Sequence, residues 1–295
     1  MTVIRQGLVQ LGTDVVPVEN VTISPAVEIM ARKSAGDYYP TQQTVFGAMA
    51  MANFTMPLER ATTLIGLTCT RFTTAKICLL EIDPATGVTK AGDTHTLIEN
   101  NSADDFAYCC INGFSASQNG VATADVSCWF TAATPGATSP LKVTDSSAAL
   151  ALADQPTLHT LGPLTINGSA IAGVISVSGA LNHDASLRQT DGDLYPSLFS
   201  WKGSDPVLTI EHSDPLAVLS ALGLQGEDIA DTTKVTFRQR GATGLIDAAV
   251  LSVTVADGFC VPQDISGGVG QTASQGIVIT PAAASATAHP WTVGA

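Results

Sequence analysis

The sequence predicts a mainly β protein built from two tandem β-sandwich or barrel domains, each with one short helix. Short runs of apolar, often β-branched residues recur along the 295 residues, and Gly, Asn, Asp and Pro turn signals separate them. The stretch Gly-Asp-x-Tyr-Pro occurs twice, beginning at Gly36 and at Gly192. Further matches follow in the same order at nearly the same shift, as expected of an internal repeat.

The two copies align at shifts of 156 to 158 residues. Segment 8–22 lies over 164–178, with Leu, Gly and Val at matching places. The other matches, in chain order, are 57–67 with 214–224, Lys76 with Lys234, 85–87 with 242–244, and 116–120 with 273–276. We therefore predict one domain at 1–150 and a second at 157–295. Segment 144–160 reads as the linker, and its middle, 147–154, has the composition of a short helical turn.

Each copy is expected to begin with a hairpin. Asn167-Gly168 interrupts the run LTINGSAIAGVISVSGAL and is a strong signal for a two-residue β-turn. Gly12-Thr13 is the weaker equivalent in the first copy. A polar excursion then ends in the Gly-Asp-x-Tyr-Pro stretch. Because Gly adopts positive φ readily and Pro fixes its own φ, this stretch predicts a shaped loop or a long hairpin arm.

The rest of the second copy predicts a helix between strands. Ser213 or Asp214 can cap the start of the helix, with Pro215 in its first turn and Gly223 near its end. The apolar side of this helix is expected to consist of Leu216, Leu219 and Leu222, with Val218 and Ala221 beside them. Strands are expected at 205–212, 233–241 and 248–259.

Composition indicates a protein that hides surface against copies of itself. Hydrophobic residues make up 45% of the chain and charged residues only 13%, about half the usual share. A lone monomer normally needs more surface charge to stay soluble, although a surface rich in Thr, Ser, Asn and Gln is an alternative. The formal net charge of −13 argues against a protein that grips nucleic-acid phosphates. It still permits a protein that lets DNA pass without binding it.

No motif predicts an enzyme, a cofactor site or a metal site. The five histidines are scattered, and the Asp residues beside Gly36 and Gly192 fit turns better than catalysis. No signal-peptide-like run opens the sequence, and no run of 18 apolar residues predicts a membrane span. Six cysteines without a C-x-x-C pair indicate small buried residues in a reducing compartment, with disulfides or a metal as lesser possibilities. They are Cys69, Cys78, Cys109, Cys110, Cys128 and Cys260.

Segment 164–222 resembles the tail tube (major tail) proteins of long-tailed bacteriophages. The likeness rests on the order of an early strand–turn–strand, a polar arm, a Gly-Asp-x-Tyr-Pro-like loop, a strand and a helix. It covers most of 164–260 and, through the repeat, 8–130. Members of this family form stacked rings, and some carry two tube domains in one chain and form three-membered rings with pseudo-sixfold symmetry.

The resemblance implies a virion structural protein of the tail, assembled in the host cytoplasm, that conducts DNA during genome ejection. Its partners would be itself, as a trimeric ring stacked on other rings, and other tail proteins. DNA would pass without tight binding, because an acidic lumen repels phosphates. The arms would reach a neighbouring subunit or ring, and the candidate contact residues are Gly36, Asp37, Tyr39, Pro40, Gly192, Asp193, Tyr195 and Pro196.

Three alternatives stay open at this point. A hub or distal tail protein would share the fold but cap the tube as a single ring. A head decoration protein or another β-sandwich binding module is less consistent with aromatic residues at only 5%. An enzyme lacks any supporting constellation. The nearly uncharged tail 279–295 is expected either to dock on a neighbour or to form a disordered end. Docking predicts that deleting the tail blocks stacking while leaving the fold intact.

Overall fold

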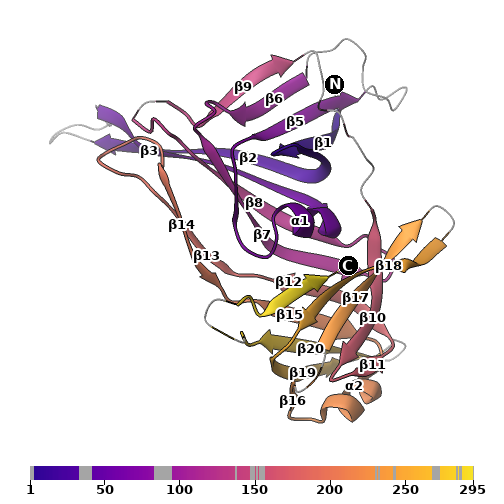
Figure 1. The fold of residues 1–295 in the computed structure, drawn as a ribbon. Helices are drawn as coiled ribbons and strands as arrows, with labels where there is room; N and C mark the ends of the chain where they lie inside the picture. The colour runs from indigo at the N-terminus through magenta and orange to yellow at the C-terminus, as the bar shows by residue number, and fades with distance from the viewer. Residues whose placement is uncertain are drawn as a thin grey trace.

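The protein is mainly β, with large antiparallel sheets and two short helices (Figure 1). The structure is a computed structural model that describes residues 3–32, 42–82, 95–136, 138–146, 150, 152, 157–229, 231, 233–241, 244–267, 273–283, 285 and 288–294. No helix among these residues is long and apolar enough to cross a membrane.

The first half forms one continuous sheet in the order β7-β8-β3-β2-β1-β5-β6-β9, and β4 pairs with β7 at its edge. Its elements are β1 (Val3–Leu11), β2 (Asp14–Arg32), β3 (Gln42–Pro57), α1 (Leu58–Leu64), β4 (Thr70–Phe72), β5 (Ala75–Ile82), β6 (His95–Asn100), β7 (Phe106–Ser117), β8 (Thr123–Thr131) and β9 (Leu141–Ser146). The long β2 connects two parts of this sheet, because its first residues pair with β1 and its later residues with β3.

The second half forms two sheets and a separate hairpin. Its elements are β10 (His159–Ile166), β11 (Ser169–Ile171), β12 (Val174–Ala180), β13 (His183–Arg188), β14 (Leu198–Ser204), β15 (Val207–His212), α2 (Pro215–Leu222), β16 (Glu227–Asp228), β17 (Thr233–Gly241), β18 (Gly244–Val255), β19 (Gly258–Ser266), β20 (Ser274–Pro281) and β21 (Trp291–Gly294). One sheet has the order β11-β10-β17-β18-β21, and β13 pairs with β14. The strands β16-β19-β20-β15-β12 continue the large sheet of the first half.

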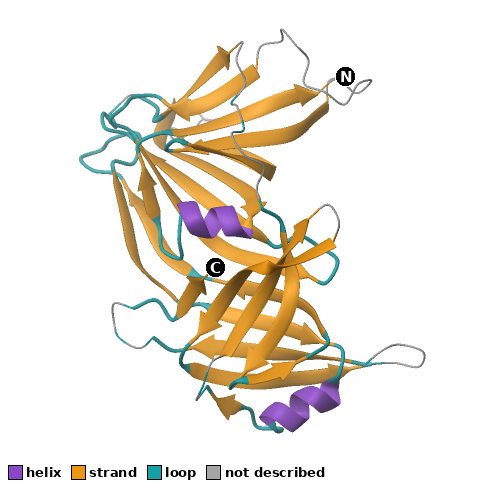
Figure 2. Cartoon of the chain, turned by 45° about the vertical axis from the view of Figure 1, so that its right-hand side comes forward, coloured by secondary structure: helices purple, strands orange, loops and turns teal. Residues whose placement is uncertain are grey.

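The two halves share the order of their elements and their strand pairings. The pairings of the first half and their counterparts are β1·β2 with β10·β11, β1·β5 with β10·β17, β2·β3 with β12·β15, β3·β8 with β15·β20, β7·β8 with β19·β20, β4·β7 with β16·β19, β5·β6 with β17·β18, and β6·β9 with β18·β21. The shift of 156 also holds for register, since Thr22 pairs with Asn53 and Ser178 pairs with Thr209. Figure 2 shows one helix in each half.

Several local predictions are confirmed. Ile166 pairs with Ser169 around Asn167-Gly168, and both turn residues have positive φ. The Asp214 carboxylate accepts hydrogen bonds from the backbone N–H groups of Leu216 and Ala217, as an N-cap does. The expected strands at 205–212 and 233–241 correspond to β15 and β17, and the expected strand at 248–259 falls on β18 and the start of β19.

Other predictions are wrong. Leu216 does not face the core, because its side chain is 78% exposed, whereas Val218 and Leu222 of the same predicted side are buried. The match of 116–120 with 273–276 is not structural, since the first segment ends β7 and the second begins β20. The match of 85–87 with 242–244 and most of the predicted helical turn at 147–154 lie outside the described residues.

The C-terminal tail also differs from its prediction. Residues 291–294 belong to the fold of their own chain, because β21 pairs with β18 and Trp291 is only 1% exposed. The cysteine prediction is partly wrong as well. Cys69 and Cys110 are joined by a disulfide that fastens the segment before β4 to β7. The other four cysteines are buried thiols.

Candidate assembly interface

The two halves are joined edge to edge by one strand pairing, β7·β12, which has no counterpart inside either half. The strands are antiparallel, with Ser178 opposite Ser115 and Gly179 opposite Phe114. Backbone hydrogen bonds continue at both ends of this ladder. Gln118 N donates to Ile175 O over 3.1 Å, and Leu181 N donates to Asn112 O over 2.8 Å. The large sheet therefore runs through both halves without interruption (Figure 1).

Phe114 is the central side chain of this junction. It belongs to β7 of the first half, yet its ring makes edge-to-face contacts with Phe237 and Trp291 of the second half. The ring centroids are 6.1 Å and 5.7 Å apart, and Phe114 is only 3% exposed. Aromatic pairs of this geometry contribute to stability beyond their buried area. The interior of the second half is thus completed by a residue of the first half.

Two glycines allow the strands to approach at this point. A side chain at Gly179 would run into the Phe114 ring. A Cβ at Gly113 would lie 2.6 Å from the carbonyl oxygen of Gly179, which is closer than real Cβ contacts. The pair Phe114 and Gly179 therefore combines one large residue with one that has no side chain, so that the interior stays filled without overlap.

A second contact is made by the hairpin β13·β14, which lies against the first half. Phe199 of β14 stacks on Tyr108 of β7, with ring centroids 4.4 Å apart and planes 15° apart. Phe199 also approaches Trp129 of β8, at a centroid distance of 5.7 Å. The hairpin therefore covers aromatic side chains of β7 and β8 that face away from Phe114.

The predicted contact loop of the second copy also lies on the first half. Tyr195 N donates to Pro135 O over 3.0 Å, and Pro196 O accepts from Ala132 N over 2.9 Å. Asp193 forms the expected turn, because its backbone N–H donates to Thr190 O over 2.9 Å. These residues thus bring the halves of one chain together. Their predicted equivalents Gly36, Asp37, Tyr39 and Pro40 lie outside the described residues.

Replacing Gly192 with alanine is expected to destabilise this loop by about 1–2 kcal/mol, because Gly192 has φ +80°, a conformation that costs L-residues energy. The matched control is Gly136→Ala in the facing segment. Its added Cβ would lie 3.7 Å from an Asp193 carboxylate oxygen, an ordinary contact, so we expect almost no change. Urea unfolding of both variants measures the difference, and equal stabilities would contradict the strained turn.

Two strands of the large sheet, β19 and β2, each extend past their partner on one side, which leaves part of that edge unpaired among the described residues. Beyond Cys260, the β16-facing edge of β19 is unpaired within the described residues. Beyond Val18, the β1-facing edge of β2 is likewise unpaired in the part of the chain that the structure describes. Exposed edges of this kind are templates for pairing with another chain.

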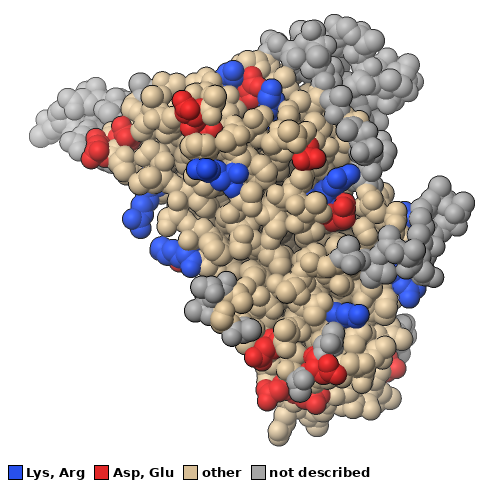
Figure 3. All heavy atoms as spheres, viewed as in Figure 1, with Lys and Arg blue, Asp and Glu red and all other residues tan. Residues whose placement is uncertain are grey.

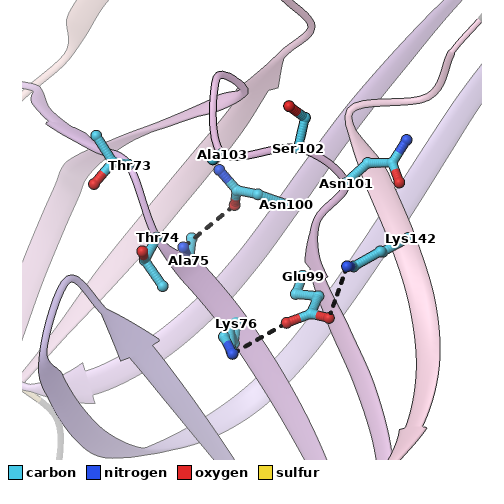
Figure 4. A pocket seen from close by; sticks show the side chains of 10 residues that line it. All are labelled: Thr73, Thr74, Ala75, Lys76, Glu99, Asn100, Asn101, Ser102, Ala103 and Lys142. Atoms are coloured by element: carbon cyan, nitrogen blue, oxygen red, sulfur yellow. Dashed lines mark hydrogen bonds and ion pairs between the residues drawn. The ribbon is translucent and has the colours of Figure 1, made fainter.

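The first half also contains a pocket lined by polar side chains (Figure 4). It lies where β5, β6 and β9 meet. The Glu99 carboxylate forms ion pairs with Lys76 Nζ at 3.2 Å and with Lys142 Nζ at 3.3 Å. Burial alone would raise the pKa of the Glu99 carboxyl, but hydrogen bonds from both lysines and their charges outweigh it and lower the pKa below its usual value. Because these three residues pair directly across neighbouring strands, we assign them to holding the sheet.

Replacing Glu99 with glutamine should cost about 0.5–1 kcal/mol of stability at pH 7, since the ion pairs are partly exposed. The lowered pKa means that Glu99 contributes fully above its ordinary value of 4.5 and loses this contribution as the pH falls through the lowered value. Urea unfolding at a series of pH values from 7 downward should therefore show a stability gap between wild type and variant that narrows as the pH falls below 4.5. The exposed Glu227→Gln is the control, and a gap that does not narrow as the pH falls would contradict the ion-pair assignment.

Sequence reasoning found the loop at Gly192 but missed the centre of the junction. The alternation of buried Phe114 and Ala116 with exposed Ser115 and Ser117 was a usable signal of an inward-facing residue. No group of three or more His, Cys, Asp or Glu among the described residues could hold a metal ion. No family model matches the sequence, and no curated protein shows significant similarity to it.

Proposed function

We propose that this protein is a self-assembling structural subunit of tail-tube type, in which each half is one tube domain and three chains form a ring of six domains. The main support is the junction β7·β12, in which the edge strand of one half pairs with a strand of the other half that is not its equivalent. Such a head-to-tail contact is heterologous, and repeated heterologous contacts form a closed ring when the rotation per unit fits.

The surface supports assembly by burial rather than by charge. Figure 3 shows scattered charges on one face with wide uncharged areas between them. Acidic residues gather at the far end of the second half, near α2 and β16. Exposed large apolar side chains are also present, among them Leu216, Leu224 and Ile265.

In the proposed role, rings stack into a tube that conducts DNA during ejection from a phage particle. A net charge of −13 suits a conduit, because like charge repels phosphates and keeps DNA from adhering to the wall. The resemblance of 164–222 to tail tube proteins and the shared strand order of the two halves support this role over other self-assembling β proteins.

Electron microscopy of the purified protein at rising concentration tests the proposal. Tubes whose end-on class averages show three chains and six similar densities are expected. Discrete trimers that never stack would move the assignment to a hub or distal tail protein. Monomers at every concentration, alone and with tail-initiation partners, would overturn it.

A further inference from the structure

We infer that one chain binds the next by pairing the free edge of β19 with the free edge of β2, and that Ile265 is the central side chain of this contact. The partner is a second copy of this chain, because the contact repeats one that the chain already makes between its own halves. The inference rests on the self-assembly proposed above and identifies the two surfaces that meet.

Strand β19 occupies in the second half the place that β7 occupies in the first. Cys109 of β7 pairs with β8 on one side and β4 on the other. Cys260 of β19 pairs with β20 and β16 in the same way. Both strands then carry a register irregularity after the next two residues. Counted from these cysteines, Ile265 is the counterpart of Phe114.

The edge that β7 uses for the junction is free on β19. Strand β7 continues past β4 and pairs with β12 over Gly113–Ser117. Strand β19 continues past β16, but Gln263–Ser266 have no partner on that side among the described residues. Ile265 is 53% exposed there, whereas Phe114 is buried.

The matching edge is free on β2. Thr22 corresponds to Ser178 of β12, because the two residues pair with Asn53 and Thr209 at the same shift. In β12 the edge facing away from β15 is occupied by β7. In β2 the same edge is unpaired beyond Val18 within the described part of the chain.

Transferring the internal register places Thr22 opposite Ser266 and Ile23 opposite Ile265. The orientation of the side chains agrees, because Ile23 packs against the buried core, as Phe114 does, and Gly179 faces the Phe114 ring in the junction. The sizes agree as well. The junction combines the large Phe114 with Gly179, and the contact between chains would combine two isoleucines of intermediate size. Each pair therefore fills the space between the sheets.

The first half also has an open place for Ile265. Phe114 meets Phe237 and Trp291, which are almost fully buried. By strand pairing, their counterparts in the first half are Leu79 and Leu141, and both are only partly buried. The apolar interior that Phe114 closes in the second half is therefore left open in the first.

A second exposed residue on β19 fits the same scheme. Phe259 is the counterpart of Tyr108, because the two residues pair with β16 and β4 at equivalent positions. Tyr108 is covered by the stacked ring of Phe199, which the other half provides. Phe259 is 38% exposed. Both large apolar residues that β19 exposes thus correspond to residues of β7 that a neighbouring domain covers.

The two contacts differ at one end. Asp264 stands where the junction has Gly113, whose approach to the Gly179 carbonyl leaves no room for a Cβ. At this point β19 of one chain and β2 of the next must therefore lie slightly farther apart than β7 and β12 do. Thr22 and Ser266 lie beyond this point, so they are the better positions for a cross-link.

Cysteine cross-linking tests the register. Directly opposed residues of antiparallel strands lie within the Cα distance that a disulfide spans. The variant Thr22→Cys/Ser266→Cys, oxidised under native conditions, should give covalent dimers and trimers on a non-reducing gel. The equivalent internal pair Ser178→Cys/Ser115→Cys is the positive control and should close within one chain.

The negative controls are each single variant and the out-of-register pair Thr22→Cys/Gln263→Cys. None of them should give covalent dimers or trimers on the gel. A ladder from the out-of-register pair and none from Thr22→Cys/Ser266→Cys would overturn the inference. If rings form in the microscope without this cross-link, the tube proposal stands and the assignment of these edges fails. If no rings form at all, both fail.

Ile265→Asp provides an independent readout. Placing a carboxylate in an apolar contact should raise the concentration at which rings form at least about tenfold. The thermal midpoint of the monomer should not change, because Ile265 is exposed in the single chain. Unchanged assembly of this variant would overturn the placement of Ile265.

Discussion

Phe114→Ala is expected to lower the free energy of unfolding by about 3–5 kcal/mol, because it leaves a cavity where the two halves meet. Phe114 is 3% exposed and contacts Phe237 and Trp291 across the junction. Urea unfolding followed by tryptophan fluorescence measures the loss. The fluorescence of Trp291 should change even where the variant remains folded, since its neighbouring ring is gone.

Phe259→Ala is the matched control for this substitution. It removes the same kind of side chain from β19, the second-half counterpart of β7, at a position where the ring is 38% exposed. We expect a loss below about 1 kcal/mol for the single chain, as for surface substitutions generally. Equal losses for the two variants would show that Phe114 does not hold the halves together.

Trp291→Ala is expected to have a similarly large effect, about 3–5 kcal/mol, although it lies only four residues from the end of the sequence. Trp291 is 1% exposed, and β21 pairs with β18. Trp291→Phe should retain most of the stability, because the indole Nε1 has no hydrogen-bond partner among the described residues.

Trp201→Ala on the hairpin β13·β14 is the control, since that ring is 38% exposed. A loss below 1 kcal/mol for Trp291→Ala would mean that the tail does not contribute to the core. The double variant Phe114→Ala/Trp291→Ala should lose less than the sum of the single variants, because the two rings touch.

Local signals predicted local structure well. Asn167-Gly168 marked a hairpin turn, and Asp214 followed by Pro215 marked the start of α2, because turn and cap preferences depend on neighbouring residues alone. The alternation in 233–241 identified the buried Val235 and Phe237 of β17. The mainly β class followed from many such signals together.

Relations between distant strands could not be predicted in this way. A period of two tells which face a side chain occupies, but it does not tell which strand lies alongside. The pairing of β7 with β12 therefore had no signature in the sequence. Exposure of Leu216 was missed for a related reason, since which side of a short helix faces the core depends on the sheet beside it.

The candidate site was predicted only at its margin. Tyr195 and Pro196 were found through a repeated motif, and the structure places them on the first half. The residue types at Phe114 and Gly179 are not repeated in the other half, because the corresponding positions hold Ile265 and Ile23. Their complementarity of size becomes visible only once the two strands are known to pair. The burial of Trp291 has no local signal, because the tail around it lacks charge and regular alternation.

The insertion of Phe114 into the second half makes the complete core of that half depend on the first half. The second half needs β7, which is synthesised early, and β21, which is synthesised last, to complete its interior. Contacts between such distant segments form slowly, because a long loop must close first. The first half can thus serve as a template on the nascent chain, while residues 157–295 alone would lack a part of their own core.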